Sequence, residues 1–82
     1  MARTATLFTR EACGLCHEMR EVLDGARAQH PFELLVIDLD TEATEAQREA
    51  YTLEVPVLEL DGRKVAKYRI DEARLLRLLE GG

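Results

Sequence analysis

The sequence Cys13-Gly14-Leu15-Cys16-His17 contains both cysteines of this 82-residue chain. A short run before it, Thr4–Thr9, has the composition of a β-strand. After it, apolar residues recur at helical spacing, at Leu15, Met19, Val22, Leu23 and Ala26. Two thiols three positions apart can close a small disulfide ring, and a helix N-terminus stabilises the first of them as a thiolate. The sequence therefore predicts redox chemistry where a strand passes into a helix.

The segment Phe32–Asp38 is the next element, after the helix has ended at His30-Pro31. It is an almost continuous apolar run rich in branched side chains, which is typical of a central strand covered on both faces in a parallel sheet. Strand, helix and strand in this order require a right-handed crossover in nearly all proteins. We therefore expect the first half of the chain to form a βαβ unit.

A second, short helix is predicted to open with the acidic sequence Asp40-Thr41-Glu42. Its apolar face is thin and consists of Ala46, Ala50 and Leu53. The segment Val55–Leu60 then predicts a strand with a proline near its start, a position that strands tolerate.

A β-hairpin is indicated by Asp61-Gly62, a strong signal for a two-residue turn, with Arg63–Arg69 as the returning antiparallel strand. Asp71 can cap a last helix that ends at Gly81-Gly82 and carries a leucine stripe for the core. The expected order is βαβαββα, and the expected fold is an α/β domain over residues 1–82 with a four-stranded mixed sheet and helices on both faces. A chain of this length can bury one core.

The net charge of −5 argues against nucleic acid and anionic membranes as partners, because both are bound through Lys and Arg. No apolar run approaches the ~20 residues that span a bilayer, and the N-terminus lacks the apolar core of a signal peptide. We therefore expect a cytoplasmic protein. In that compartment an isolated C-x-x-C pair is typical of a catalytic or metal-binding site and not of a structural disulfide.

A C-x-x-C pair at the first strand-to-helix turn and a Val55-Pro56 pair at the third strand resemble the thioredoxin superfamily, and the short chain resembles glutaredoxin. The resemblance extends over nearly the whole sequence. It implies a thioredoxin-like fold and a thiol–disulfide oxidoreductase. By the same resemblance, Cys13 is the nucleophile, Cys16 is the resolving thiol and Pro56 is a cis-proline that faces them.

The resemblance also implies three residues that contact the substrate. Arg10 matches a basic residue that glutaredoxins hold near the nucleophile and use for glutathione. Val55 offers its backbone to an extended peptide, and Asp71 stands near an acidic position of the family.

Two departures from the glutaredoxin pattern bear on the substrate. Glu54 stands where glutaredoxins usually have threonine, and its carboxylate is expected to repel an anionic tripeptide. The paired glycines expected after the hairpin are replaced by residues near Ala66-Lys67. Tyr51 and Tyr68 are expected to be packing residues, and His17 an exposed residue on the helix surface.

The predicted partners are a disulfide-containing client protein or a small disulfide, together with glutathione or a thioredoxin-type reductase as electron donor. No resident cofactor or metal is expected, and we expect a monomer. One alternative is a thioredoxin-fold binding module without redox activity. Another is a c-type haem protein, because Cys13-x-x-Cys16-His17 matches the haem attachment signature. A metal site using these ligands is also an alternative, although structural zinc needs four.

Overall fold

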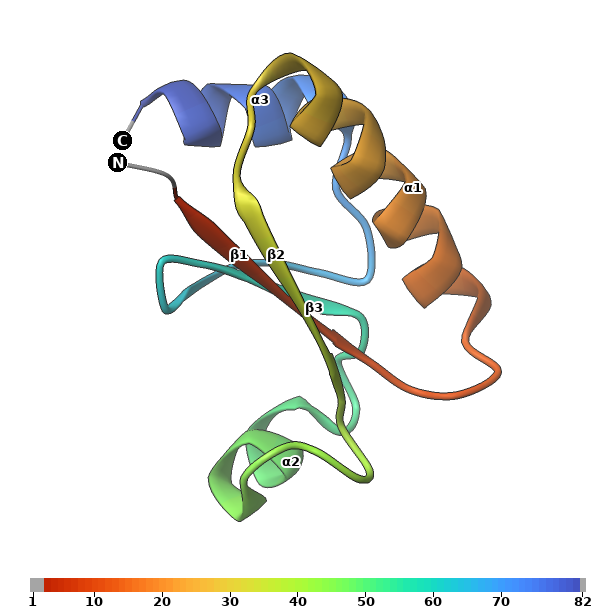
Figure 1. The fold of residues 1–82 in the computed structure, drawn as a ribbon. Coiled ribbons are helices and arrows are strands. Elements are labelled where there is room, and N and C mark those ends of the chain that lie inside the picture. Colours follow the sequence, from red (N-terminus) through yellow and green to blue (C-terminus); the bar gives the residue numbers. More distant parts are fainter. Residues whose placement is uncertain (1–2, 82) are drawn as a thin grey trace.

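The computed structural model describes residues 3–81, which form seven helices and strands (Figure 1). In chain order these are β1 (Thr4–Thr9), α1 (Gly14–Gln29), β2 (Glu33–Asp38), α2 (Glu45–Tyr51), β3 (Val57–Leu60), β4 (Arg63–Lys67) and α3 (Glu72–Glu80). The predicted order βαβαββα is confirmed. No helix among the described residues combines the length and the apolar character needed to cross a membrane.

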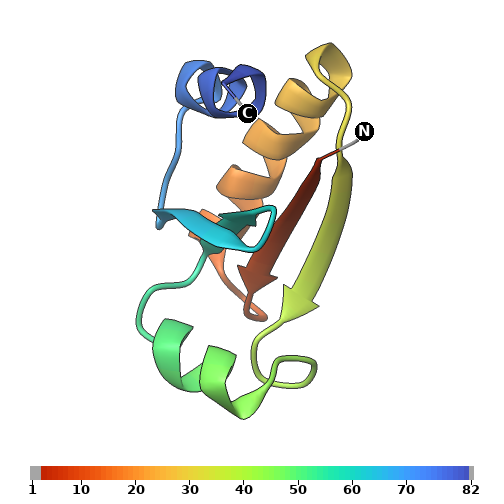
Figure 2. The same ribbon diagram turned by 90° about the vertical axis from the view of Figure 1, so that its left-hand side faces the viewer.

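The four strands form one mixed sheet in the order β2-β1-β3-β4. β1 and β2 are parallel, with Thr4 opposite Glu33, whereas β1 with β3 and β3 with β4 are antiparallel. Helices α1 and α3 lie on one side of this sheet and α2 lies on the other, near the end where β1 runs into α1 (Figures 1 and 2). The thioredoxin-like fold with helices on both faces is therefore confirmed.

Alternation along β1 divides the core between the two faces of the sheet, since successive side chains of a strand point to opposite sides. Leu7 faces α1 and α3 and belongs to the larger cluster. Phe8 faces α2 and belongs to a smaller cluster with Leu39 and Val57, against which Tyr51 packs. The rings of Phe8 and Tyr51 are 5.1 Å apart between centroids. The end of β1 is therefore packed on both faces of the sheet, just before the loop that leads to Cys13.

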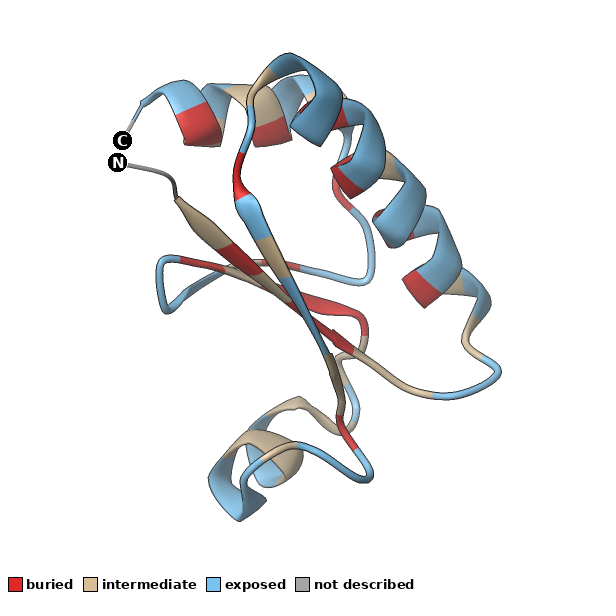
Figure 3. Ribbon diagram, viewed as in Figure 1, coloured by how far each residue is buried: buried red, intermediate tan, exposed pale blue. Residues whose placement is uncertain are grey.

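The prediction that Phe32–Asp38 forms a central strand covered on both faces is wrong. β2 is an edge strand, and part of it is coloured as exposed in Figure 3. Leu35 and Val36 are 52% and 40% exposed. The branched residues correctly indicate a strand, but they carry no information about its place in the sheet. Helix α2, on the other face of the sheet from α1 and α3 (Figure 1), has only seven residues.

Helix α2 also begins later than predicted, at Glu45 and not at Asp40. Thr44 is its N-cap, and Thr44 and Gln47 form a reciprocal capping box, which fixes the start of the helix. No residue of α2 is buried, and Leu53 lies beyond its end with 84% of its surface exposed. The predicted apolar face is therefore absent, and Tyr51 makes the contact with the core instead.

The hairpin forms as predicted, with Asp61 and Gly62 both at positive φ, 52° and 84°. Its strands are shorter than expected. β3 starts at Val57, after the proline, and β4 ends at Lys67. The next residue, Tyr68, has a φ of 65°, which turns the backbone out of the extended conformation and ends the strand.

The Tyr51 hydroxyl donates a hydrogen bond of 2.7 Å to Glu59 Oε2, which ties α2 to β3. This bond, together with burial and the charges of Glu59 and Glu54, raises the pKa of Tyr51 to about 12. The native state therefore keeps a proton that the unfolded chain releases near pH 10. The contribution to stability is complete below pH 10 and is lost as the pH rises through 12.

We predict that Tyr68→Phe, which leaves Tyr51 as the only tyrosine, shows a phenolate absorbance titration with a midpoint near pH 12. Adding Glu59→Ala removes both the acceptor and the charge, and should move the midpoint toward pH 10. Circular dichroism at each pH reports whether the fold persists. Equal midpoints in the two variants would show that Glu59 does not hold the proton.

Candidate active site

Cys13 and Cys16 are joined in a disulfide, with their Cα atoms 5.2 Å apart. Cys13 is the N-cap of α1, and its sulfur accepts a hydrogen bond from the backbone N–H of Cys16 at 3.1 Å. A cysteine sulfur therefore occupies the place that a Ser or Asp oxygen takes at an ordinary helix start. The first turn of α1 carries no acidic residue. A thiolate at Cys13 would receive this N–H and the positive end of the helix dipole.

The two cysteines differ in exposure. Cys16 is 5% exposed and buried on the inner side of α1, whereas Cys13 is half-buried at the end of the loop. In a reduced pair, only Cys13 would be open to an incoming disulfide. This asymmetry fits the roles of attacking and resolving thiol.

Pro56 lies at the same end of the sheet as the cysteines. Val57 pairs with Phe8, so Pro56 stands beside the last residue of β1, where the loop to Cys13 begins. The Val55–Pro56 peptide bond is cis, and Pro56 is fully buried. Val55 is half-buried against the smaller core cluster.

Arg10 follows β1 in the loop that leads to Cys13, and it is bound to the end of α2 and to the segment before α2. Its Nε lies 3.0 Å from Asp40 Oδ2, and its two terminal nitrogens donate to the carbonyl and hydroxyl oxygens of Thr52 at 3.0 and 2.8 Å. These bonds join β1 to the end of α2. The positive charge of Arg10 is balanced by Asp40, so a thiolate at Cys13 would experience the two charges together.

Glu54 is likewise balanced. Lys64 Nζ lies 2.6 Å from its carboxylate and Lys67 Nζ 3.6 Å. The hydrogen bond from Lys64 is the main reason that the pKa of Glu54 lies below its ordinary value. The expected repulsion of an anionic substrate by Glu54 is weaker than the sequence indicates, because two lysines share its charge.

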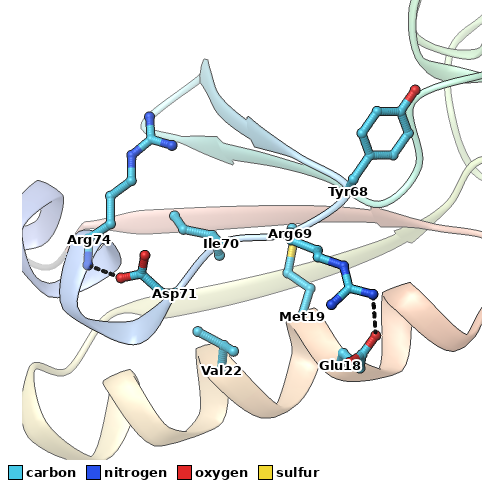
Figure 4. Close-up of a pocket in the computed structure, with 8 residues that line it drawn as sticks. All are labelled: Glu18, Met19, Val22, Tyr68, Arg69, Ile70, Asp71 and Arg74. Atoms are coloured by element: carbon cyan, nitrogen blue, oxygen red, sulfur yellow. Dashed lines mark hydrogen bonds and ion pairs between the residues drawn. The ribbon is translucent and has the colours of Figure 1, made fainter.

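Asp71 is the N-cap of α3, as expected, and its Oδ1 accepts a hydrogen bond from the N–H of Arg74 at 2.7 Å. It also lines a cleft of about 420 Å³ between α1 and the segment that joins β4 to α3 (Figure 4). Met19, Val22 and Ile70 form the apolar part of this cleft. The remaining lining residues are polar or charged: Glu18, Tyr68, Arg69, Asp71 and Arg74.

Tyr68 lies next to the candidate site, which the sequence did not lead us to expect. We expected it to be a packing residue, but it is 42% exposed. Its N–H donates to Pro56 O and its hydroxyl donates to Leu53 O, both at 2.8 Å. The sequence did offer one indication, which is that the paired glycines expected after the hairpin are missing. Tyr68 has the left-handed backbone conformation that glycine adopts most easily.

His17 is exposed and pairs with Glu21 at 2.9 Å along the surface of α1, as expected for a surface histidine. Within residues 3–81, no group of three or more His, Cys, Asp or Glu side chains is arranged to hold a metal ion.

Comparison with known proteins identifies relatives over nearly the whole chain. Residues 4–80 match the model of the "Glutaredoxin-like domain (DUF836)" family. The uncharacterized protein Rv0508 of Mycobacterium tuberculosis is 32% identical over 72 residues, which cover 84% of this chain and 74% of that protein. A glutaredoxin-like protein of Dictyostelium discoideum is 32% identical over 77 residues, covering 89% of this chain and 71% of the relative.

Solved structures agree with this assignment. Protein XcR50 of X. campestris superposes with a TM-score of 0.75 at 33% identity, covering 95% of this chain and 97% of that one. Thioredoxin-2 of a malaria parasite has a TM-score of 0.77 at 17% identity, covering 99% and 84%, and shares the fold. The sequence match and the C-x-x-C pair at the start of α1 agree, and the chain therefore belongs to the glutaredoxin-like domain family of the thioredoxin superfamily.

Proposed function

We propose that this protein is a thiol–disulfide oxidoreductase in which Cys13 is the nucleophile and Cys16 the resolving thiol. The observation that carries the proposal is the state of the two cysteines. They are close enough to form a disulfide, Cys13 caps the helix while remaining half-exposed, and Cys16 is buried behind it. A structural disulfide would not need this difference in access.

The reaction begins with the reduced dithiol. The Cys13 thiolate attacks one sulfur of a client disulfide, so that a Cys13–client bond forms while the client S–S bond breaks. The departing client sulfur leaves as a thiolate and takes up a proton. Cys16 then loses its proton and attacks Cys13 Sγ, which forms the Cys13–Cys16 disulfide and releases the second client sulfur. The client gains two electrons and two protons, and the protein loses them.

The start of α1 supports the first step, because the Cys16 N–H already points at Cys13 Sγ. A helix terminus favours a nearby negative charge by about 0.3–1 kcal/mol, which raises the thiolate fraction several-fold at most. The burial of Cys16 favours its use only after Cys13 has been captured, when the two sulfurs are held together.

The substrate in this proposal is a disulfide-containing protein or a small disulfide, and Arg10, Val55 and Asp71 remain the proposed contacts. Pro56 is proposed to face the two cysteines from the end of the sheet. Electrons come from glutathione or a thioredoxin-type reductase, and no resident cofactor takes part. The balanced charge of Glu54 is compatible with glutathione as the donor. We further propose that the protein acts as a monomer in the cytoplasm.

We predict that equilibration with defined ratios of reduced and oxidised glutathione, followed by acid quenching and intact mass measurement, gives a reversible loss of two hydrogens. The ratio at half-conversion reports the reduction potential of the pair. Cys16→Ser should instead accumulate a single glutathione adduct on Cys13, and Cys13→Ser should accumulate neither product. A wild-type mass that stays constant across all ratios would contradict the oxidoreductase and favour a binding module.

A second prediction concerns the charge at Arg10. Arg10→Ala removes the cation, whereas Asp40→Asn leaves the cation without its balancing carboxylate. If Arg10 supports the thiolate, these two variants shift alkylation of reduced Cys13 by iodoacetamide at neutral pH in opposite directions. The expected changes are roughly two- to fivefold, as for exposed charge pairs worth ~0.3–1 kcal/mol.

The matched control in this experiment is Arg20→Ala, which removes an exposed arginine that pairs with Asp24 on the surface of α1. Its alkylation rate should equal that of the wild type. Equal rates in the Arg10 and Asp40 variants as well would leave Arg10 with only its structural role of joining β1 to α2.

A further inference from the structure

The segment Leu53–Pro56 lies between α2 and β3 and ends in the proline that stands opposite the end of β1, where the loop to Cys13 begins. One residue from another part of the chain is bonded to both ends of this segment. The Tyr68 hydroxyl donates to Leu53 O, and the Tyr68 N–H donates to Pro56 O, each at 2.8 Å. Tyr68 thus spans the segment, with its backbone at one end and its side chain at the other.

The backbone conformation of Tyr68 also suggests that this arrangement has a function. Its φ of 65° is unfavourable for a residue with a Cβ, and glycine would adopt it freely. Among the described residues, the other non-glycine residues at positive φ are Asp61, in the hairpin turn, and Ala12, directly before Cys13. Two of these three residues therefore lie beside the candidate site. Backbone strain of this kind concentrates at functional positions.

The side chain of Tyr68 does not contribute to the core. It is 42% exposed, and Figure 4 shows its ring directed away from Met19 and Val22, which form the apolar floor of the cleft. The amino group of Lys67 lies 5.6 Å from the ring centroid. The ring reaches across the surface toward Leu53, so the contact it makes is the one that holds the segment.

We propose that Tyr68 is a positioning residue for thiol–disulfide exchange with protein substrates. By holding Leu53–Pro56 at both ends, it keeps the backbone of Val55 in place for a client chain that lies extended next to Cys13. The proposal rests on the proposed function. A small disulfide has no chain to lay along this segment, so its reaction at Cys13 depends much less on Tyr68.

The test compares two substrates and three variants. The substrates are insulin, as a protein disulfide, and 2-hydroxyethyl disulfide, as a small one, with dithiothreitol returning the enzyme to the dithiol. Tyr68→Phe keeps the ring and loses the bond to Leu53 O. Tyr68→Gly also loses that bond but relieves the positive φ. Tyr51→Phe is the matched control, because it removes the hydroxyl that bonds Glu59 on the face covered by α2.

We expect Tyr68→Phe and Tyr68→Gly to raise KM for insulin about three- to tenfold, the range expected from one lost hydrogen bond, with little change in kcat. Their rates with 2-hydroxyethyl disulfide should stay within about twofold of the wild type, by the same reasoning. Tyr51→Phe should leave both sets of constants unchanged at a temperature where it is folded. Hydrogen exchange at the amide of Glu54, which donates to Tyr51 O at 2.9 Å, should be faster in both Tyr68 variants, because the segment loses its bond at Leu53 O.

Other outcomes would overturn the proposal. An equal loss with both substrates would show that Tyr68 acts on the cysteines or on the fold as a whole. Unchanged constants with insulin would show that the segment needs no hydroxyl to hold it. A wild-type protein inactive on both substrates would overturn the proposed function, while the hydrogen exchange at the Glu54 amide would still report whether Tyr68 holds the segment.

Discussion

The hydrogen bond from the Cys16 N–H to Cys13 Sγ is the interaction on which the candidate site depends, because it makes the sulfur of the proposed nucleophile part of the helix start. An N-cap side chain commonly accepts a hydrogen bond from the first turn of its helix, and here the acceptor is the sulfur of Cys13 within the disulfide. The helix in turn is fixed by Met19 and Leu23, which are buried in the larger core cluster. Packing along α1 is therefore transmitted to the position of Cys13.

Around this centre, charged side chains are arranged in pairs. Arg10 is balanced by Asp40 on one side of the loop, and Glu54 is balanced by Lys64 and Lys67 on the other. Each pair also connects separate elements: β1 with the segment before α2, and the segment before β3 with β4. These side-chain charges therefore also hold together the segments that surround the candidate site.

Much of the fold could be predicted from the sequence because its signals are local. The two cysteines, the helical spacing that follows them and the turn at Asp61-Gly62 each determine a short segment, and all three appear where expected. The position of β2 could not be predicted, because the apolar run shows what the strand is made of and not which strands lie beside it. The start of α2 was missed because the capping box at Thr44 outweighs the acidic run before it.

Part of the candidate site could be named from the sequence for the same reason. Cys13, Cys16 and Pro56 belong to short motifs, so they could be named from the sequence. The partners of Arg10 and Glu54 could not, because Asp40 and Lys64 are brought to them by the fold. Tyr68 depends on a bond to Leu53, fifteen residues away in the chain, and on a backbone angle that only the structure shows.

The unpaired edge of β2 bears on whether two copies of the protein can pair strand to strand. Two such edges could in principle pair antiparallel across a twofold axis normal to the sheet. An axis at Leu35 would set each Glu33 against Ile37 of the other copy, and an axis at Val36 would set each Asp38 against Leu34. In both registers a carboxylate faces an apolar side chain at each end of a six-residue strand. The acidic residues at the ends of β2 therefore disfavour pairing of this edge with the same edge of a second copy. This is compatible with the exposed apolar residues at the centre of the strand.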